Sequence, residues 1–122
     1  MIVLGVAVAG AFGAPARYLL ERAVTASHRR LFPWGTLVVN VSGSLALGVL
    51  AGLVLSHGWS KDAQSVLGTG FLGAYTTFST YAYETVRRAE DGAPRVAVAY
   101  ALTSFVAGVG AAAIGLALTG AW

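Results

Sequence analysis

Residues 68–81 read GTGFLGAYTTFSTY and lie inside a long segment that carries no charge. Three glycines are followed there by four serine or threonine residues, at positions 76, 77, 79 and 80. Glycine and β-branched threonine both have low helix propensity. The stretch therefore allows two structures inside a membrane. One is a broken helix, whose freed backbone groups line a cavity or bind an ion. The other is a continuous helix, whose hydroxyls bond to carbonyls four residues earlier.

The charged residues divide the rest of the chain into uncharged blocks. They are confined to residues 17–30, 61–62 and 84–95 of the 122-residue chain, which is 57% hydrophobic and only 11% charged. A soluble domain of ordinary composition carries about a quarter charged residues, whereas a helix that crosses the hydrocarbon core needs about 20 apolar ones. We therefore predict an all-α membrane protein with a single domain over residues 1–122. The expected transmembrane spans are residues 2–20, 35–55, 63–83 and 96–118.

Several classes of function have no support in the sequence. The chain contains no cysteine, which excludes a disulfide framework and thiol catalysis. His28 and His57 both lie in predicted loops, and neither has a second ligand at metal-binding spacing. No serine has a histidine and a carboxylate near it in one layer of the membrane, so we predict no enzyme. The net charge of +3 is explained by loop arginines placed for membrane orientation, so we predict no nucleic-acid partner.

The polar residues inside the predicted spans are hydrogen-bond donors, and none of the spans has an acidic residue near its middle. Cation or proton coupling usually requires a carboxylate in the membrane, so this composition favours an anion path. Amide, hydroxyl and aromatic-edge groups can solvate a small anion. Arg17, at the end of the first span, either attracts anions into a vestibule or only snorkels to the interface. The donors are Asn40, Ser44, Thr76, Thr77, Ser79, Thr80, Tyr100 and Ser104.

Three stretches resemble the signatures of the Fluc/CrcB fluoride channels: residues 13–18 (GAPARY), 33–44 (PWGTLVVNVSGS) and 68–84 (GTGFLGAYTTFSTYAYE). The resemblance covers the whole chain in order. It implies a four-helix subunit that works as an antiparallel dimer and lets fluoride leave the cytoplasm passively, by electrodiffusion. It also implies a broken third helix and a structural sodium ion at the dimer centre. The sodium ligands would be the backbone carbonyls of Gly73 and Thr76.

The same resemblance implies roles for individual side chains. Asn40 would be the pore asparagine, and Phe78 would present its ring edge to fluoride. Arg17 corresponds to the family arginine near the vestibule, and Glu84 to the acidic residue that follows the motif. The implied polar track consists of Ser79, Thr80, Tyr100 and Ser104.

The chain departs from the family pattern at Tyr81, where a second pore phenylalanine is usual. A tyrosine keeps the ring edge but adds a hydroxyl, which could donate to fluoride or block its passage. The sequence leaves both effects open.

Two alternative functions compete with this hypothesis. A small multidrug transporter also has four spans, but it needs a carboxylate in the first span, and residues 1–16 contain none. A structural or non-conducting partner subunit would explain the glycines as packing positions. It would leave Asn40 and the hydroxyl cluster unexplained.

The arginines also predict an orientation. Leaving Arg17 aside, the side that holds the first and third loops carries six arginines, whereas the opposite side carries only Lys61. By the positive-inside rule, these two loops face the cytoplasm and both termini face outward across the cell membrane. Because the family fold needs two opposed subunits, we expect a different, oppositely biased paralogous chain as the partner. The six residues are Arg22, Arg29, Arg30, Arg87, Arg88 and Arg95.

A reporter fused to the C-terminus should therefore be found only outside the cytoplasm. The chain purified alone should not form dimers with full fluoride flux, since all its copies would share one orientation. Topology reporters in cells and efflux from liposomes measure the two properties. Reporters on both sides, together with full flux from the chain alone, would contradict the heterodimer hypothesis.

Overall fold

The computed structural model describes residues 1–27 and 31–121. All the elements in this part of the chain are helical, which confirms the predicted all-α class. In chain order they are α1 (Ile2–Ser27), α2 (Trp34–Ser56), α3 (Lys61–Gln64), η1 (Ser65–Leu72), α4 (Gly73–Tyr75), α5 (Phe78–Glu90) and α6 (Pro94–Leu118).

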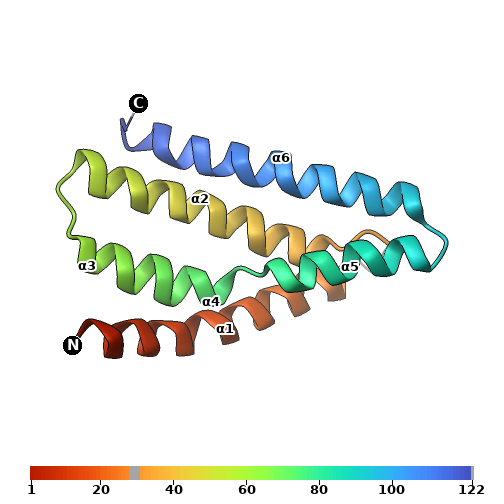
Figure 1. Cartoon of the computed structure of the whole chain (residues 1–122), viewed down its shortest axis with the longest axis horizontal. Helices are drawn as coiled ribbons and strands as arrows, with labels where there is room; N and C mark the ends of the chain where they lie inside the picture. The colour runs from red at the N-terminus through yellow and green to blue at the C-terminus, as the bar shows by residue number, and fades with distance from the viewer. Residues whose placement is uncertain (28–30, 122) are drawn as a thin grey trace.

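Three of these helices are long and run along the length of the molecule (Figure 1). Helices α1, α2 and α6 contain 26, 23 and 25 residues. Even the shortest reaches about 35 Å at 1.5 Å per residue, which exceeds a hydrocarbon core of about 30 Å. All three are apolar enough to cross a membrane. Three of the four expected spans therefore correspond to long apolar helices.

The segment expected to form the remaining span is interrupted. Helices α3, η1 and α4 follow one another without a gap up to Tyr75, and α5 begins at Phe78. Between them the backbone is extended, with φ −80° and ψ 160° at Thr76 and φ −146° and ψ 119° at Thr77. The broken helix is therefore the correct alternative. The wide helical turns of η1 precede the break, and such turns are frequent at functional sites.

The two ends of the molecule hold different connections (Figure 1). Both termini and the turn between α2 and α3 lie at one end. Residues 31–33 and the turn between α5 and α6 lie at the other. At this second end the Arg88 Nε donates to the Leu31 carbonyl at 2.6 Å, and Arg87 pairs with Asp91 at 3.3 Å. His28, Arg29 and Arg30, which the sequence assigned to loops, lie outside the described residues.

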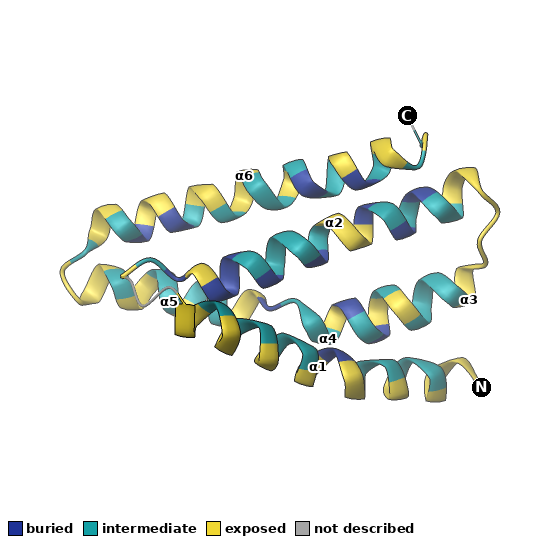
Figure 2. Ribbon diagram, turned by 180° about the vertical axis from the view of Figure 1, so that it is seen from behind, coloured by how far each residue is buried: buried dark blue, intermediate teal, exposed yellow. Residues whose placement is uncertain are grey.

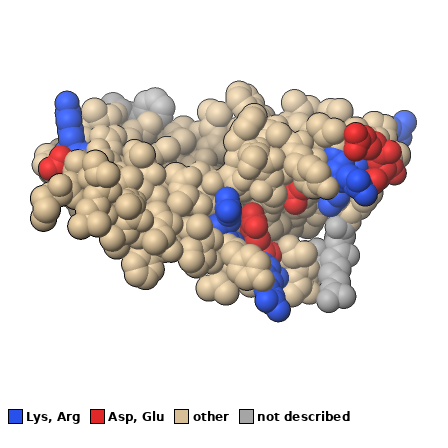
Figure 3. Space-filling model, turned by 60° about the horizontal axis from the view of Figure 1, so that its bottom comes forward, with Lys and Arg blue, Asp and Glu red and all other residues tan. Residues whose placement is uncertain are grey.

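Charged side chains cover little of the molecule. In the view of Figure 3 they gather near the two ends and in one group between them, and uncharged residues cover the surface in between. Large apolar side chains are exposed along the long helices, among them Phe12 on α1 and Val106 on α6. Such a surface is stable in lipid, because exposing apolar side chains to hydrocarbon has no hydrophobic cost.

Helix α2 forms most of the interior. It packs mainly on α6, while α1 packs on η1, α2 and α4. Figure 2 shows buried positions along much of α2, whereas α1 exposes most of its length. The side chains with less than a tenth of their surface exposed include Leu37, Val39 and Leu50 of α2 and Tyr100 and Ala111 of α6.

Glycines bring α2 and α6 into close contact. A Cβ added to Gly48 would collide with the backbone carbonyl oxygen of Ala112, and one added to Gly115 would collide with that of Leu45. A backbone atom in a helix cannot move aside as a side chain can. Small residues therefore set the distance between these two helices, as is usual in membranes.

Replacing Gly48 by alanine should separate α2 from α6 and lower the free energy of unfolding by about 1–3 kcal/mol, the usual range for overpacking. Thermal unfolding in detergent, followed by circular dichroism, measures the effect. Gly110→Ala on α6 is the matched control, because a Cβ there meets no atom within 4 Å. Equal melting temperatures for the two variants would contradict the packing argument.

Candidate functional site

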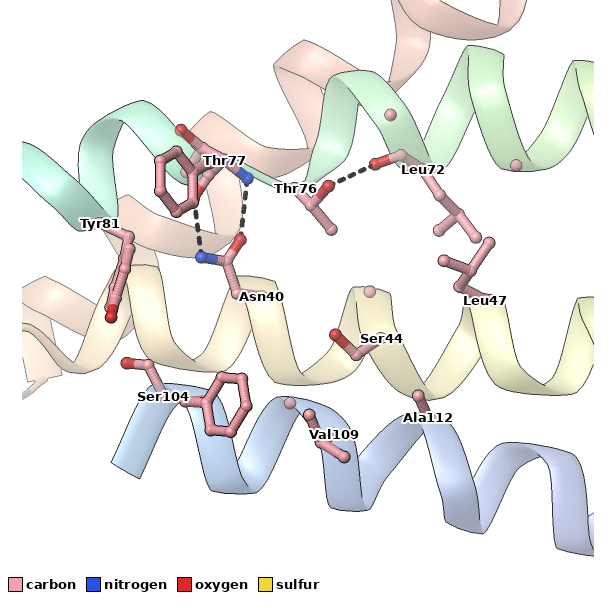
Figure 4. Close-up of a pocket in the computed structure, with 16 residues that line it drawn as sticks. Asn40, Ser44, Leu47, Leu72, Thr76, Thr77, Tyr81, Ser104, Val109 and Ala112 are labelled. Carbon is pink, nitrogen blue, oxygen red and sulfur yellow. Dashed lines mark hydrogen bonds between the residues drawn. The ribbon is translucent and has the colours of Figure 1, made fainter. Parts of the chain in front are cut away.

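One side chain pairs with the backbone at the break. The Asn40 Nδ2 on α2 donates to the Thr77 carbonyl at 2.8 Å, and the Thr77 N–H donates to the Asn40 Oδ1 at 2.8 Å (Figure 4). The amide thus supplies one donor and one acceptor to a peptide that has left the helix. Backbone groups in a membrane must be satisfied within the protein. Asn40 performs this task across 37 residues of sequence.

Thr77 also begins the second half of the broken helix. Its Oγ1 accepts from the Thr80 N–H at 3.2 Å and donates to the Thr80 Oγ1 at 3.0 Å. A threonine oxygen at this position satisfies one of the free N–H groups at a helix start. Ser79 lies 3.3 Å from the same hydroxyl. Ser79 and Thr80, both predicted as pathway residues, therefore contact the Thr77 hydroxyl that caps α5.

The break leaves two particular carbonyls without their regular helical donors. In a helix, each carbonyl accepts from the N–H four residues later. For Gly73 that donor is the Thr77 N–H, which goes to Asn40 instead. For Thr76 it is the Thr80 N–H, which goes to the Thr77 hydroxyl.

Freed backbone carbonyls are the groups that bind sodium in broken membrane helices. The donor set at Gly73 and Thr76 therefore fits the sodium ion that the sequence resemblance implies. Two carbonyls do not complete a coordination shell. In the part of the chain that the structure describes, no group of three or more histidine, cysteine or acidic residues lies close enough to hold a metal.

A pocket of about 570 Å³ opens beside the break, between α2, α6 and the two halves of the interrupted helix. Figure 4 shows Asn40, Thr77, Tyr81 and Ser104 toward one end and Leu47, Leu72 and Ala112 toward the other. Six of the predicted site residues line this pocket: Asn40, Gly73, Thr76, Phe78, Tyr81 and Ser104.

Ser104 lines the pocket and carries a hydroxyl group. Its Oγ is buried and forms no hydrogen bond with the described residues. A buried polar group left unsatisfied costs about 1–3 kcal/mol. This hydroxyl is therefore a donor suited to a ligand.

The hydroxyl of Tyr81 has an acceptor on the protein. It donates to the Ala101 carbonyl on α6 at 3.4 Å. The ring centroid of Tyr81 lies 5.7 Å from that of Phe78 and 5.5 Å from that of Tyr100. The hydroxyl thus links α5 to α6, while the ring stays between two other aromatic rings.

The remaining predicted residues do not line the pocket. Tyr100 is fully buried, and its hydroxyl donates to the Glu84 Oε2 at 3.0 Å. Arg17 is half-buried on α1 and lies within electrostatic range of Glu21. The structure therefore places the predicted residues in three groups: those that line the pocket, those at the Thr77 cap, and Tyr100 and Arg17 outside both.

The pocket walls are largely apolar and uncovered. Phe78 is 79% exposed, and Phe105 and Val109 on α6 are 69% and 57% exposed. Such side chains make the pocket an open groove rather than an enclosed cavity.

The sequence identified Thr77 as a hydroxyl donor but not as a site residue. It did not indicate that Phe105 and Val109 line the pocket. Thr77 had a readable signal, because a threonine just before a helix start is a typical N-cap. The two α6 residues had none, since nothing local distinguishes a pocket wall from a lipid-facing position.

The comparisons with known proteins agree over most of the chain. The family model described as CrcB-like protein, Camphor Resistance (CrcB), matches residues 4–116. A Frankia casuarinae protein named fluoride-specific ion channel FluC 1 is 50% identical over 113 residues, which cover 88% of each chain. A protein of the same name from Streptomyces avermitilis is 47% identical over 110 residues, or 89% of each chain. Mycobacterium tuberculosis fluoride-specific ion channel FluC 2 is 46% identical over 114 residues, covering 93% of this chain and 87% of that one. The chain belongs to the CrcB family.

Proposed function

We propose that the chain is a subunit of a fluoride-selective channel that lowers cytoplasmic fluoride by passive electrodiffusive export. The observation that carries the proposal is the pocket at the break, which Asn40 and Ser104 line. The Ser104 hydroxyl has no hydrogen-bond partner among the described residues. None of the described residues that line the pocket carries a carboxylate. The names of the relatives support the same ion.

The pocket chemistry suits a small, strongly hydrated anion. A pore must replace the water around such an ion with closely placed donors. The Asn40 amide nitrogen carries two N–H groups, and Thr77 takes one of them. The other N–H, the Ser104 hydroxyl and the ring edges of Phe78 and Tyr81 then form the fluoride pathway.

The polar residues outside the pocket extend this pathway in the proposal. Ser79 and Thr80 lie beside Phe78 at the start of α5, and Tyr100 contacts the ring of Tyr81. Arg17, near Glu21, is assigned to the vestibule, where its charge attracts anions. The multidrug-transporter alternative is not favoured, since no carboxylate of the described residues lines the pocket.

We assign the interrupted segment from α3 to α5 as the fourth membrane crossing, because it runs along the same direction as the three long helices (Figure 1). The cytoplasmic side holds the first and third loops, and both termini face outward. The arginine bias supports this orientation.

An antiparallel second subunit completes the channel in this proposal. The exposed Phe78, Phe105 and Val109 give the open groove an apolar rim that a partner can cover. The one-sided arginine distribution favours a different paralogous chain over a second copy. At the contact between the subunits, the Gly73 and Thr76 carbonyls from each side hold a structural sodium ion.

Phe78→Ile and Asn40→Asp should each abolish fluoride flux when the chain is reconstituted with its partner. Isoleucine removes the ring edge. Aspartate removes the N–H that Thr77 accepts and adds a charge that repels anions. A fluoride electrode follows efflux from proteoliposomes, with the exposed Phe12→Ile on α1 as the control. Wild-type flux in both pocket variants would defeat the site assignment.

Replacing all sodium by N-methylglucamine should reduce flux, since that cation is too large for a site formed by backbone carbonyls. Efflux in sodium, potassium and N-methylglucamine media, measured on the same vesicles, gives the comparison. Equal flux in all three, after dialysis long enough to empty a slowly exchanging site, would contradict the sodium proposal.

A further inference from the structure

A row of five aromatic rings runs from the pocket to the first residue of α2. The successive ring centroids lie 5.7 Å apart for Phe78 and Tyr81, 5.5 Å for Tyr81 and Tyr100, 5.5 Å for Tyr100 and Phe32, and 4.8 Å for Phe32 and Trp34. The first three residues belong to the proposed pathway. Phe32 does not line the pocket, and no role has been assigned to it so far.

Tyr100 is held from two directions in this row. Its side chain is fully buried, with the Tyr81 ring on one side and the Phe32 ring on another. The planes of Phe32 and Tyr100 meet at 89°, the edge-to-face arrangement that aromatic pairs favour. Because the Tyr100 hydroxyl reaches Glu84, the orientation of the ring determines where this donor lies.

The backbone around Phe32 is also anchored. The carbonyl of the preceding Leu31 accepts from Arg88 on α5 at 2.6 Å, and the Phe32 carbonyl accepts from the Trp34 N–H at 2.9 Å. The following Pro33 is buried, and a proline restricts the backbone of the residue before it. Phe32 therefore presents its ring from a constrained position at the end of the molecule.

We infer that Phe32 is a positioning residue of the fluoride pathway, and that it acts through Tyr100. Its ring holds the Tyr100 ring, and with it the hydroxyl, in line with Tyr81 and Phe78. A smaller side chain would leave a gap into which Tyr100 tilts, which moves its hydroxyl, and the hydrogen bond that this hydroxyl donates to Glu84, out of line with the track. The inference rests on the proposed channel function. Phe32, in the segment before α2, then contributes to conduction without touching the ion.

Phe32→Leu, reconstituted with the partner chain, should lower the fluoride flux per folded dimer by about three- to tenfold, the range that loss of one edge-to-face contact allows. Phe32→Tyr keeps the ring and should conduct as the wild type does. Phe12→Leu makes the same replacement on an exposed surface and should leave flux unchanged. Wild-type flux in Phe32→Leu would overturn the inference.

A double-mutant cycle separates positioning from a general loss of stability. Tyr100→Phe removes the hydroxyl, so adding Phe32→Leu to it should cause little further loss of flux. If the two effects multiply independently, Phe32 does not act through Tyr100. Should Phe32→Leu fail to fold, Phe32→Met takes its place in the same cycle.

A third measurement does not depend on conduction. Tyrosine-ring NMR signals, with Tyr100 assigned through Tyr100→Phe, should show slow ring flipping in the wild type and faster flipping in Phe32→Leu. Flipping unchanged by the replacement would overturn the inference even if the wild type carried no fluoride. Absent wild-type flux with the expected NMR change would instead count against the proposed function alone.

Discussion

The paired hydrogen bonds between the Asn40 amide and the Thr77 backbone are the interaction on which the rest of the site depends. A break in a membrane helix exposes N–H and C=O groups that hydrocarbon cannot satisfy, and each buried unsatisfied group costs about 1–3 kcal/mol. One asparagine supplies both partners at 2.8 Å. The extended backbone is therefore stable where lipid alone would restore a continuous helix.

Several functional features follow from this one pairing. Because Thr77 gives its N–H to Asn40, the Gly73 carbonyl loses its helical donor. Because the Thr77 hydroxyl takes the Thr80 N–H, the Thr76 carbonyl is freed as well, and α5 begins at Phe78 beside the pocket. The proposed cation ligands and the proposed aromatic pathway residue are thus consequences of the same local geometry. Asn40 thus has a structural role at the break, and in the proposal it also contributes to conduction.

The pocket is only half enclosed, and its two kinds of wall have different origins. The polar wall is internal, since Ser104, Asn40 and Thr77 are fixed by contacts between α2, the break and α6. The apolar rim of Phe78 and Phe105 remains exposed, and the proposed second subunit would cover it. Close packing of α2 on α6 at Gly48 and Gly115 brings the polar wall together, so the geometry of the proposed ion pathway depends on this packing.

The sequence by itself determined the helical class and the membrane environment, because long uncharged blocks can satisfy their backbone in lipid only as helices. It located the 68–81 stretch and, through family resemblance, six of the residues that line the pocket. The family resemblance implied a broken third helix, but only the tertiary structure placed the break at Thr76 and Thr77. Glycine and threonine merely lower helix propensity, and the deciding partner, Asn40, lies on another helix. The Tyr100–Glu84 bond and the Phe32–Tyr100 ring contact were equally unreadable. They depend on how helices rotate and pack against one another, and local sequence patterns do not encode that rotation.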